Sequence, residues 1–227
     1  MSDEIVNDTD NIDKAVGGSV FERFFTGRNE ASYVAPGTLF MTANYVNLIA
    51  FETSEGLFLV DTGMKEAGEA VYEEIRKQTD APLHTVVYTH GHLDHAFGLR
   101  PWLDAGESPR IIAHENVVER FRTYMKTGPM NSHVNCVQFG IQAGIKWPQQ
   151  QEDFFWPDTT YRDQLTLHIG GERFELHHAK GETDDETWVW ACDREIVCSG
   201  DLWVGMLPNC GNPQKVQRYP EGWADAL

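Results

Sequence analysis

The stretch Thr89-His90-Gly91-His92-Leu93-Asp94-His95 decides the fold. It follows a short apolar run over residues 85–88, which is typical of a buried strand. Four side chains that bind transition metals, three imidazoles and one carboxylate, lie within six positions. In an extended chain, residues 90, 92 and 94 would share one face and residue 95 would face the other way. The chain must therefore curl after the strand, and we expect Gly91 to permit that turn.

A curled loop would divide these ligands between two ions. His90 and His92 would bind one ion, and Asp94 and His95 would bind the second. Imidazole and carboxylate ligands suit Zn²⁺, and Mn²⁺ or Fe²⁺ also accept them. The alternative is a histidine-rich surface loop that binds no ion. Because four ligands at this spacing after a strand are much rarer than lone surface histidines, the sequence predicts a metal site.

The run resembles the HxHxDH motif of the metallo-β-lactamase superfamily. Val60-Asp61-Thr62-Gly63 resembles the strand end whose Asp supports the metal-binding loop in that family, and Ser199-Gly200-Asp201 resembles the later strand end whose Asp bridges the two metals. The resemblance covers about residues 36–227. It implies a domain of the α/β class, an αββα sandwich with two mixed sheets inside and helices outside. It also implies a metal-dependent hydrolase.

The patterning of the chain agrees with that architecture. Residues 1–35 are interpreted as an N-terminal arm and residues 36–227 as the metallo-β-lactamase-like domain. Residues 128–160 lack a regular pattern and are interpreted as a long insertion near the active site. Strands are expected over residues 45–52, 57–60, 85–89, 111–113, 165–169, 172–177, 186–192 and 195–199, and helices over residues 65–79 and 115–125.

One departure from the family pattern concerns the next ligand. Most members place a histidine there in a Gly-His-Thr context, whereas residues 181–185 read Gly-Glu-Thr-Asp-Asp. This segment resembles the alkylsulfatase-like branch of the family, in which glutamate ligands occur. The resemblance therefore assigns Glu182 to the metal of His90 and His92. His178 is the rival ligand, and a solvated acidic turn is the alternative without a metal.

A second departure lies near the end of the sequence. Family members carry a final histidine ligand after the bridging Asp, but no histidine follows His178 here. We interpret the chain as C-terminally truncated at Leu227, which leaves the metal of Asp94 and His95 one ligand short. If the sequence ends there naturally, either water fills the position or the protein is not a standard two-metal enzyme.

The expected chemistry follows from the ligands. Two divalent ions lower the pKa of a shared water and supply hydroxide near neutral pH, with Asp94 and Asp201 as the catalytic residues that orient it. Asp61 is the leading candidate for holding the histidines in place. The resemblance favours an alkyl sulfate as the small-molecule substrate. A lactonase or thioesterase acting on a neutral carbonyl is the main alternative, and a non-hydrolytic di-iron redox or metal-binding module is the other.

Several residues are candidates for substrate contact. Four aromatic residues could form an apolar wall for an alkyl chain or a plain hydrophobic cluster: Trp147, Phe154, Phe155 and Trp156. Three alternating polar residues could contact a polar group or make ordinary loop hydrogen bonds: Asn131, His133 and Asn135. Arg122 and Arg162 are possible sulfate contacts. An Arg or Lys cluster above the metals would favour sulfate over a carbonyl.

Composition excludes several other roles. The net charge of −17 argues against nucleic acid as a partner. No apolar run approaches the roughly 20 residues of a membrane span, and the acidic N-terminus lacks a signal-peptide pattern, so we expect a cytoplasmic protein. The arm leaves a homo-oligomer possible. None of the four cysteines forms a CxxC pair, and for Cys192 and Cys198 we predict inert thiols rather than a disulfide.

Overall fold

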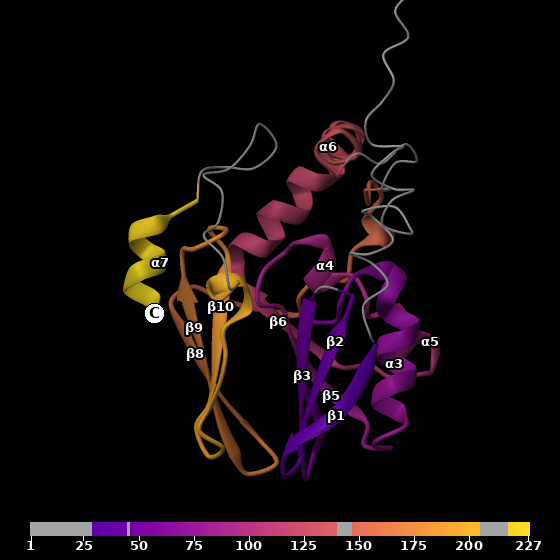
Figure 1. Cartoon of the computed structure of the whole chain (residues 1–227), viewed down its shortest axis with the longest axis vertical. Helices are drawn as coiled ribbons and strands as arrows, with labels where there is room; N and C mark the ends of the chain where they lie inside the picture. The colour runs from indigo at the N-terminus through magenta and orange to yellow at the C-terminus, as the bar shows by residue number, and fades with distance from the viewer. Residues whose placement is uncertain (1–28, 45, 140–146, 205–217) are drawn as a thin grey trace, which may run out of the picture.

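Two β-sheets face each other, with helices on their outer sides (Figure 1). The computed structural model describes residues 29–44, 46–139, 147–204 and 218–227. Within these ranges, the larger sheet has seven strands in the order β1-β2-β3-β4-β5-β6-β7, and the smaller has four in the order β11-β10-β9-β8. This is the αββα sandwich that the sequence predicts, but only the larger sheet is mixed, because every pairing in the smaller sheet is antiparallel.

The larger sheet is antiparallel from β1 to β4 and parallel from β4 to β7. The smaller sheet is antiparallel throughout. The strands of the larger sheet are β1 (Glu30–Ala35), β2 (Thr38–Ala43), β3 (Val46–Thr53), β4 (Gly56–Val60), β5 (Leu83–Val87), β6 (Arg110–His114) and β7 (Thr159–Tyr161). Those of the smaller sheet are β8 (Gln164–Ile169), β9 (Glu172–Ala179), β10 (Glu186–Ala191) and β11 (Ile196–Cys198).

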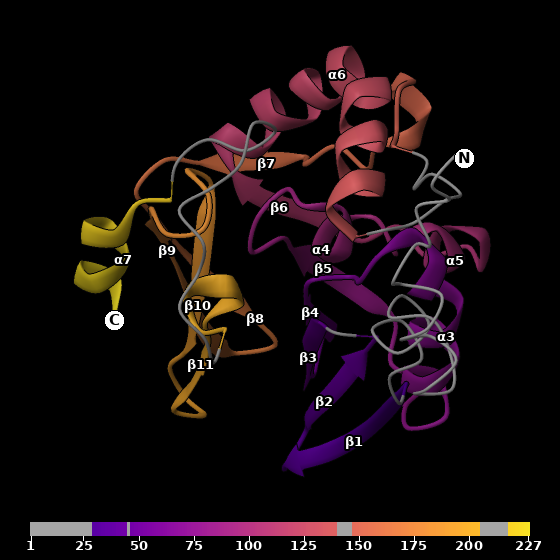
Figure 2. The same cartoon turned by 45° about the horizontal axis from the view of Figure 1, so that its top comes forward.

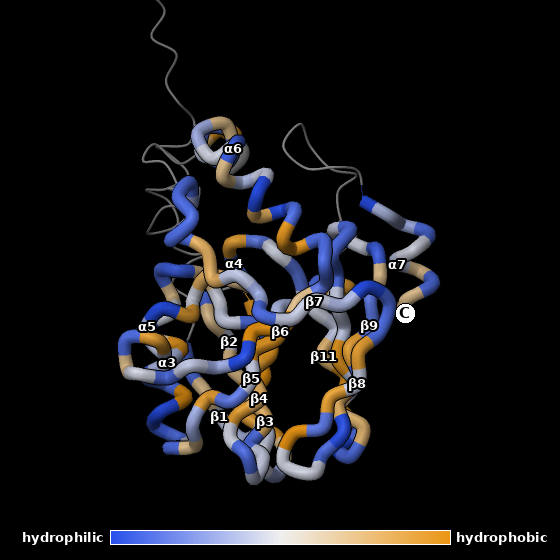
Figure 3. Tube along the Cα trace, turned by 180° about the vertical axis from the view of Figure 1, so that it is seen from behind, coloured by the Kyte–Doolittle hydropathy of each residue, from blue (hydrophilic) through white to orange (hydrophobic). Residues whose placement is uncertain are grey.

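Strand β4 separates two apolar cores. All five of its residues are buried, as expected for a strand covered on both faces. Leu57 and Leu59 belong to the core beneath the helices, whereas Phe58 and Val60 belong to the core between the two sheets. Figure 3 shows hydrophobic residues gathered along β4 and β5, in the middle of the molecule. The alternation of side chains along one strand thus holds both layers together.

Helices cover the outer faces of both sheets (Figure 2). On the larger sheet, α3 buries Val71 and Ile75 and packs against β1 and β2. On the smaller sheet, α7 packs against β9. None of the helices in the described ranges has the length and apolar character that a bilayer crossing requires. The α-helices are α3 (Gly68–Arg76), α4 (Leu93–Ala96), α5 (Arg100–Asp104), α6 (Glu115–Phe139) and α7 (Pro220–Ala226), and the 3₁₀ turns are η1 (Lys65–Ala67), η2 (Gln151–Asp153) and η3 (Gly200–Leu202).

Two expected boundaries were wrong. The sheet begins at Glu30 rather than at residue 36, because residues 30–35 pair with β2; residues 1–28 of the expected arm lie outside the described ranges. The expected irregular region was also wrong over residues 128–139, because α6 continues through Pro129 to Phe139. The Thr127 hydroxyl donates to the Thr123 carbonyl at 2.8 Å, and the Tyr124 ring packs edge-on against Trp147. Local hydrogen bonds and packing thus outweigh the missing proline N–H.

The cysteines in the described ranges form no disulfide. Cys136, Cys192 and Cys198 are free thiols, and the predicted buried thiol is confirmed for Cys198, whereas Cys192 is only partly buried. Burial raises the pKa of the Cys198 thiol well above its usual value, so this group is protonated and inert. Cys210 lies outside the described residues.

Candidate metal centre

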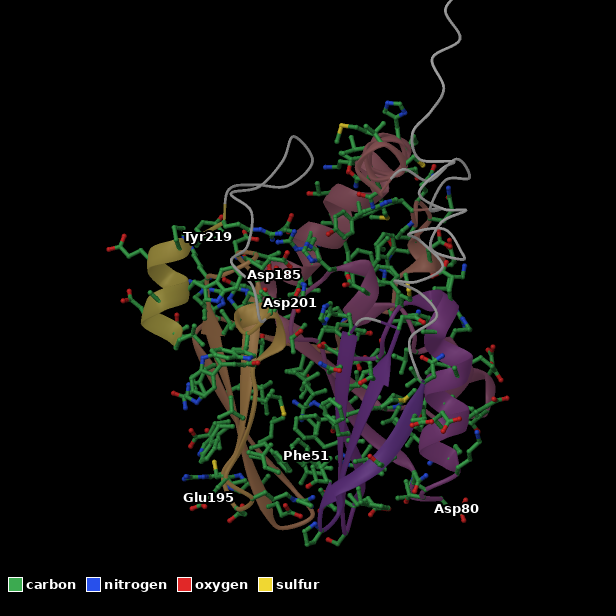
Figure 4. The ribbon with its side chains drawn as sticks, viewed as in Figure 1. Phe51, Asp80, Asp185, Glu195, Asp201 and Tyr219 are labelled. Carbon is green, nitrogen blue, oxygen red and sulfur yellow. The ribbon has the colours of Figure 1, made fainter. Side chains whose placement is uncertain are left out.

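The predicted ligands gather at one end of the space between the two sheets. The His90 to His95 run follows the carboxyl end of β5, Asp201 follows β11, and Glu182 lies in the loop between β9 and β10. Figure 4 shows Asp185 and Asp201 at this end, far from Asp80 and Glu195 at the other end. Loops at the carboxyl ends of parallel strands are the usual place for a binding site in an α/β protein.

The first group of donor atoms comes from His90, His92 and Glu182. His90 Nε2 lies 2.9 Å from His92 Nδ1, and Glu182 Oε2 lies 3.1 Å from His92 Nδ1 and 3.6 Å from His90 Nε2. Burial, with the nearby imidazoles of His95 and His92, holds the pKa of His90 well below its usual value. His90 is therefore neutral, which is the state in which an imidazole binds a metal.

The second group comes from His95, Asp94 and Asp201. His95 Nε2 lies 3.5 Å from Asp201 Oδ1 and 3.6 Å from Asp94 Oδ2. The donor atoms of His90, His95 and Asp201 lie within 4.8 Å of one another, so the two groups adjoin at His90. Among the described residues, buried His95 Nε2 has no hydrogen-bond partner. A buried nitrogen without a partner, facing two carboxylates, is the environment that a cation would complete.

Asp61 holds His95 in this orientation, as the sequence predicted. Its Oδ2 accepts from His95 Nδ1 at 2.8 Å and from the Thr89 hydroxyl at 2.8 Å, while its Oδ1 accepts from the Thr89 amide at 2.7 Å. With Nδ1 engaged by a carboxylate, Nε2 of His95 is directed toward Asp94 and Asp201.

The carboxylates in and around the two donor sets carry more negative charge than the nearby cationic side chains balance. Burial raises the pKa of Asp201 to about 7, with Glu182 and Asp94 adding to the effect against the opposing charge of His95. Burial and the neighbouring carboxylates of Asp201, Asp185 and Glu182 raise the pKa of Glu186 well above its usual value. For His95, burial lowers the pKa, but the carboxylates outweigh it and hold the pKa well above its usual value. Protons thus occupy positions where a divalent cation would relieve the same repulsion.

The rival ligand His178 points elsewhere. Its Nδ1 donates to the Glu186 carbonyl at 3.0 Å, and its ring stacks on His114 at a centroid distance of 3.7 Å. It belongs to neither group of clustered donor atoms in the described part of the chain. Glu182 is therefore the carboxylate that the fold brings to His90 and His92.

The expected sulfate contacts are not beside this group. Arg122 forms an ion pair with Glu119 on the same helix, and Arg162 forms one with Glu115 at 2.7 Å. Both arginine side chains are more than half exposed, at 56% and 74%. Their carboxylate partners hold them at the surface, so the sequence interpretation of these two residues was wrong.

The three alternating polar residues lie on α6 and not in a loop. Asn131 is buried, and its Nδ2 donates to the Thr127 hydroxyl at 3.0 Å. Asn135 is buried as well, whereas His133 is exposed. The helical period turns Asn131 and Asn135 to one buried face and His133 to the opposite, exposed face, so the three residues do not form one contact surface.

The aromatic residues belong to the core beneath the helices. Phe154 and Phe155 are buried there, with Trp156 packed partly buried against them, which matches the alternative of a hydrophobic cluster. Trp147 is buried too, but it also lines a cavity of about 490 Å³. Met64, Leu93 and Phe97 form the rest of the apolar wall, and Lys65 and Glu66 are among the polar lining residues. Leu93 lies between His92 and Asp94, so this cavity adjoins the clustered ligands.

Two arginines that sequence reasoning missed do reach the site. The Arg218 guanidinium forms an ion pair with the Glu182 carboxylate, and its Nη1 donates to the Glu182 carbonyl at 2.8 Å. Arg120 Nε donates to Asp185 Oδ2 at 2.8 Å. The acidic segment 182–186 was the only sign in the sequence that arginines lie here, because buried carboxylates need cationic partners. The sequence does not show which basic residues fill that role.

Comparison with known proteins agrees with this geometry. The family model described as the metallo-beta-lactamase superfamily matches residues 41–203. The chain belongs to this superfamily. A linear primary-alkylsulfatase of Pseudomonas sp. (strain ATCC 19151) is 31% identical over 198 residues, which cover 78% of this chain and 37% of that protein. The chain thus spans little more than a third of the length of that curated relative.

Solved structures of the superfamily share the fold. The stereoselective inverting sec-alkylsulfatase Pisa1 from Pseudomonas sp. matches with a TM-score of 0.71 at 17% identity, covering 87% of this chain and 35% of that one. A subclass B3 metallo-beta-lactamase of Bradyrhizobium japonicum matches with a TM-score of 0.54 at 18% identity, covering 75% and 59%. At these identities the likeness extends to the fold alone.

Proposed function

We propose that this chain forms the metal-binding domain of a hydrolase that cleaves sulfate monoesters of apolar alcohols with two Zn²⁺ ions. The observation that carries the proposal is the convergence of two adjoining sets of donors, in which the imidazoles are buried and the carboxylates are partly buried. The 31% identity to a linear primary-alkylsulfatase supports the substrate class.

The donors suit the ions by type and by burial. His90, His92 and Glu182 would hold one ion, and Asp94, His95 and Asp201 would hold the second. Bound Zn²⁺ lowers the pKa of a water molecule and supplies hydroxide near neutral pH. As the proposed catalytic residues, Asp94 and Asp201 would accept hydrogen bonds from that water and orient it. Mn²⁺ or Fe²⁺ would accept the same donors.

Arg218 supports sulfate over a neutral carbonyl. Its side chain is 9% exposed and forms an ion pair with Glu182, so a fixed positive charge lies beside the first ligand set. Among the described residues, its buried Nε has no hydrogen-bond partner. A guanidinium N–H with free donor capacity is a suitable partner for a sulfate oxygen. We assign to Arg218 the role that the sequence analysis gave to Arg122 and Arg162.

The cavity beside Leu93 supports an apolar alcohol group. Its volume of about 490 Å³ is within the range of small-molecule sites, and Met64, Phe97 and Trp147 supply its apolar wall. We assign the organic group of the ester to this cavity, with the sulfate directed toward Arg218. This arrangement places the scissile bond next to Asp94 and Asp201.

The test is a substrate panel with measured metal content. Linear alkyl sulfates of increasing chain length, lactones and thioesters are offered to the zinc-loaded protein, and product is quantified. We expect alkyl sulfates to be cleaved and the lactones and thioesters to react at least tenfold more slowly. Preferred turnover of lactones or thioesters would replace this proposal with a carbonyl hydrolase. A coloured, redox-active iron site without hydrolysis would replace it with a di-iron module.

A further inference from the structure

Gly91 lies between two proposed ligands, and its backbone is tied to a distant loop. The Gly91 amide donates to Asp185 Oδ2 at 3.0 Å. A Cβ atom at Gly91 would lie 2.9 Å from Arg120 Cδ and 3.2 Å from Asp185 Oδ2. The glycine is therefore needed for the close approach of these two side chains rather than for the turn that the sequence suggested, because its φ angle lies outside the left-handed region.

Asp185 is fixed from a second side by helix α6. The Asp185 side chain is fully buried, and the oxygen that accepts from Gly91 also accepts from Arg120 Nε at 2.8 Å. Arg120 Nη2 reaches Asp184 Oδ1 at 2.7 Å, and Asn116 Nδ2, one helical turn earlier, donates to the Asp184 carbonyl at 2.9 Å. Burial would raise the pKa of Asp185, but Arg120 outweighs it and holds the pKa below its usual value. Asp185 is therefore ionised and held by three contacts from α6 to residues 184 and 185.

These contacts join the two loops that carry the first ligand set. Gly91 separates His90 from His92, and Asp185 lies three residues after Glu182. We propose that Arg120 and Asp185 are positioning residues that fix the His90 and His92 donors relative to Glu182 and thereby set the affinity for the metal. This inference rests on the proposed function in one respect, because it requires these three residues to bind the ion.

A purely structural role would have a different signature. Replacing a buried ion pair by apolar residues of similar volume is often neutral or stabilising, so the fold alone does not need the pair. The Gly91 amide, in contrast, needs an acceptor to keep its place. A variant that fills the space of the ion pair with apolar side chains but offers Gly91 no acceptor therefore distinguishes the two roles. A positioning role predicts weaker metal binding in a chain that still folds.

The experiment measures zinc affinity of the purified chain by competition with a chromophoric chelator. We expect Asp185→Ala to lower zinc affinity by about 10–100-fold, the range typical for partners that orient metal ligands. The zinc affinity of Asp185→Asn should fall by less than tenfold, because the amide oxygen of the new side chain still accepts from the Gly91 amide. The matched control is Arg122→Met, on the same helix with a side chain 56% exposed. The zinc affinity of Arg122→Met should stay within twofold of the wild-type value.

A double variant tests whether weaker zinc binding is only a consequence of a folding defect. Arg120→Met with Asp185→Leu removes the ion pair and keeps apolar volume, and urea unfolding without metal reports its stability. We expect the double variant to keep a cooperative unfolding transition, with some loss of stability because the Gly91 amide loses its acceptor, and to show the weakened zinc affinity of Asp185→Ala. Wild-type affinity in Asp185→Ala, or recovery of affinity in the double variant, would overturn this inference alone. A wild-type chain that binds no zinc would overturn the ligand assignment together with it.

Discussion

The space between the two sheets has two ends that differ in what fills them. At one end Phe51, Phe58 and Phe174 pack with ring centroids 4.5–6.0 Å apart. At the other end His90, His95 and Asp201 lie among further carboxylates. The first end is stabilised by removing apolar surface from water, whereas the second pays for burying charge unless a cation is bound. The same sandwich thus separates the residues that hold the fold from those that perform the chemistry.

The largest expected effect on stability lies at the apolar end. Phe174→Ala should lower the free energy of unfolding by about 3–5 kcal/mol, because a fully buried ring leaves a cavity between the sheets. Urea unfolding of the metal-free chain measures this. Val197→Ala, on β11 and 53% exposed, is the control and should stay within about 0.5 kcal/mol. Equal losses for the two variants would show that burial of the Phe174 ring does not stabilise the apolar end as described.

The opposite pattern is expected at the polar end. Glu182→Gln keeps an oxygen for Arg218 but removes the ligand charge, so zinc affinity should fall by about 100-fold while metal-free stability changes by about 1 kcal/mol or less. Chelator competition and urea unfolding measure the two quantities.

His178→Ala is the matched control, because His178 contacts the Glu186 carbonyl and not the donor sets. Its zinc affinity should stay within about threefold of the wild-type value. A larger loss for His178→Ala than for Glu182→Gln would return the ligand role to His178.

The pH dependence of the metal-free chain sharpens the comparison further. Burial raises the pKa of Asp201 to about 7, above its unfolded value of about 3.9. The folded chain therefore holds a proton that the unfolded chain releases, and stability should fall as pH rises from about 4 to about 7. Asp201→Asn cannot ionise, so it should flatten this slope and exceed the wild type by about 1 kcal/mol or more at pH 7.5. Urea unfolding at pH 4.5, 6 and 7.5, with chelator present, measures how stability depends on pH in the wild type and in Asp201→Asn. The same pH dependence in both chains would contradict the raised pKa of Asp201.

The smallest effect is expected in the cavity beside the ligands. Leu93→Ala should raise KM for long alkyl sulfates by about threefold to tenfold and leave kcat unchanged, because a lost apolar contact weakens ground state and transition state alike. Short alkyl sulfates should show less than a twofold change. Leu165→Ala, a partly buried residue of the core between the sheets, is the control. The same KM shift in both variants would remove the cavity from the substrate site.

The sequence revealed the sandwich and most donors because these features are local. Short continuous apolar runs mark β4 and β5, and the run from His90 to His95 concentrates four ligands in one loop. Helix α6 was cut short because Gly128-Pro129 has the composition of a helix end, whereas packing outside the helix decides its length. Strands β1, β2 and β7 were missed, and in β1 the surface-facing residues break the apolar pattern.

The two arginines at the site could not be found in this way. Arg218 lies 36 positions from Glu182, and Arg120 lies 65 positions from Asp185. A single arginine carries no periodic signal, and only the fold shows which acidic segment it reaches. The exposed alternatives, Arg122 and Arg162, have no feature in the sequence that sets them apart from the buried pair.

The most direct measurement is a titration of the metal-free chain with zinc, in which hydrolysis of octyl sulfate is recorded at each addition. We predict that zinc binds and that turnover rises in proportion to the bound zinc until the sites are filled. Absence of zinc binding, or turnover that is independent of zinc, would contradict the proposal that the cluster around His90 is the metal centre of a sulfate-ester hydrolase.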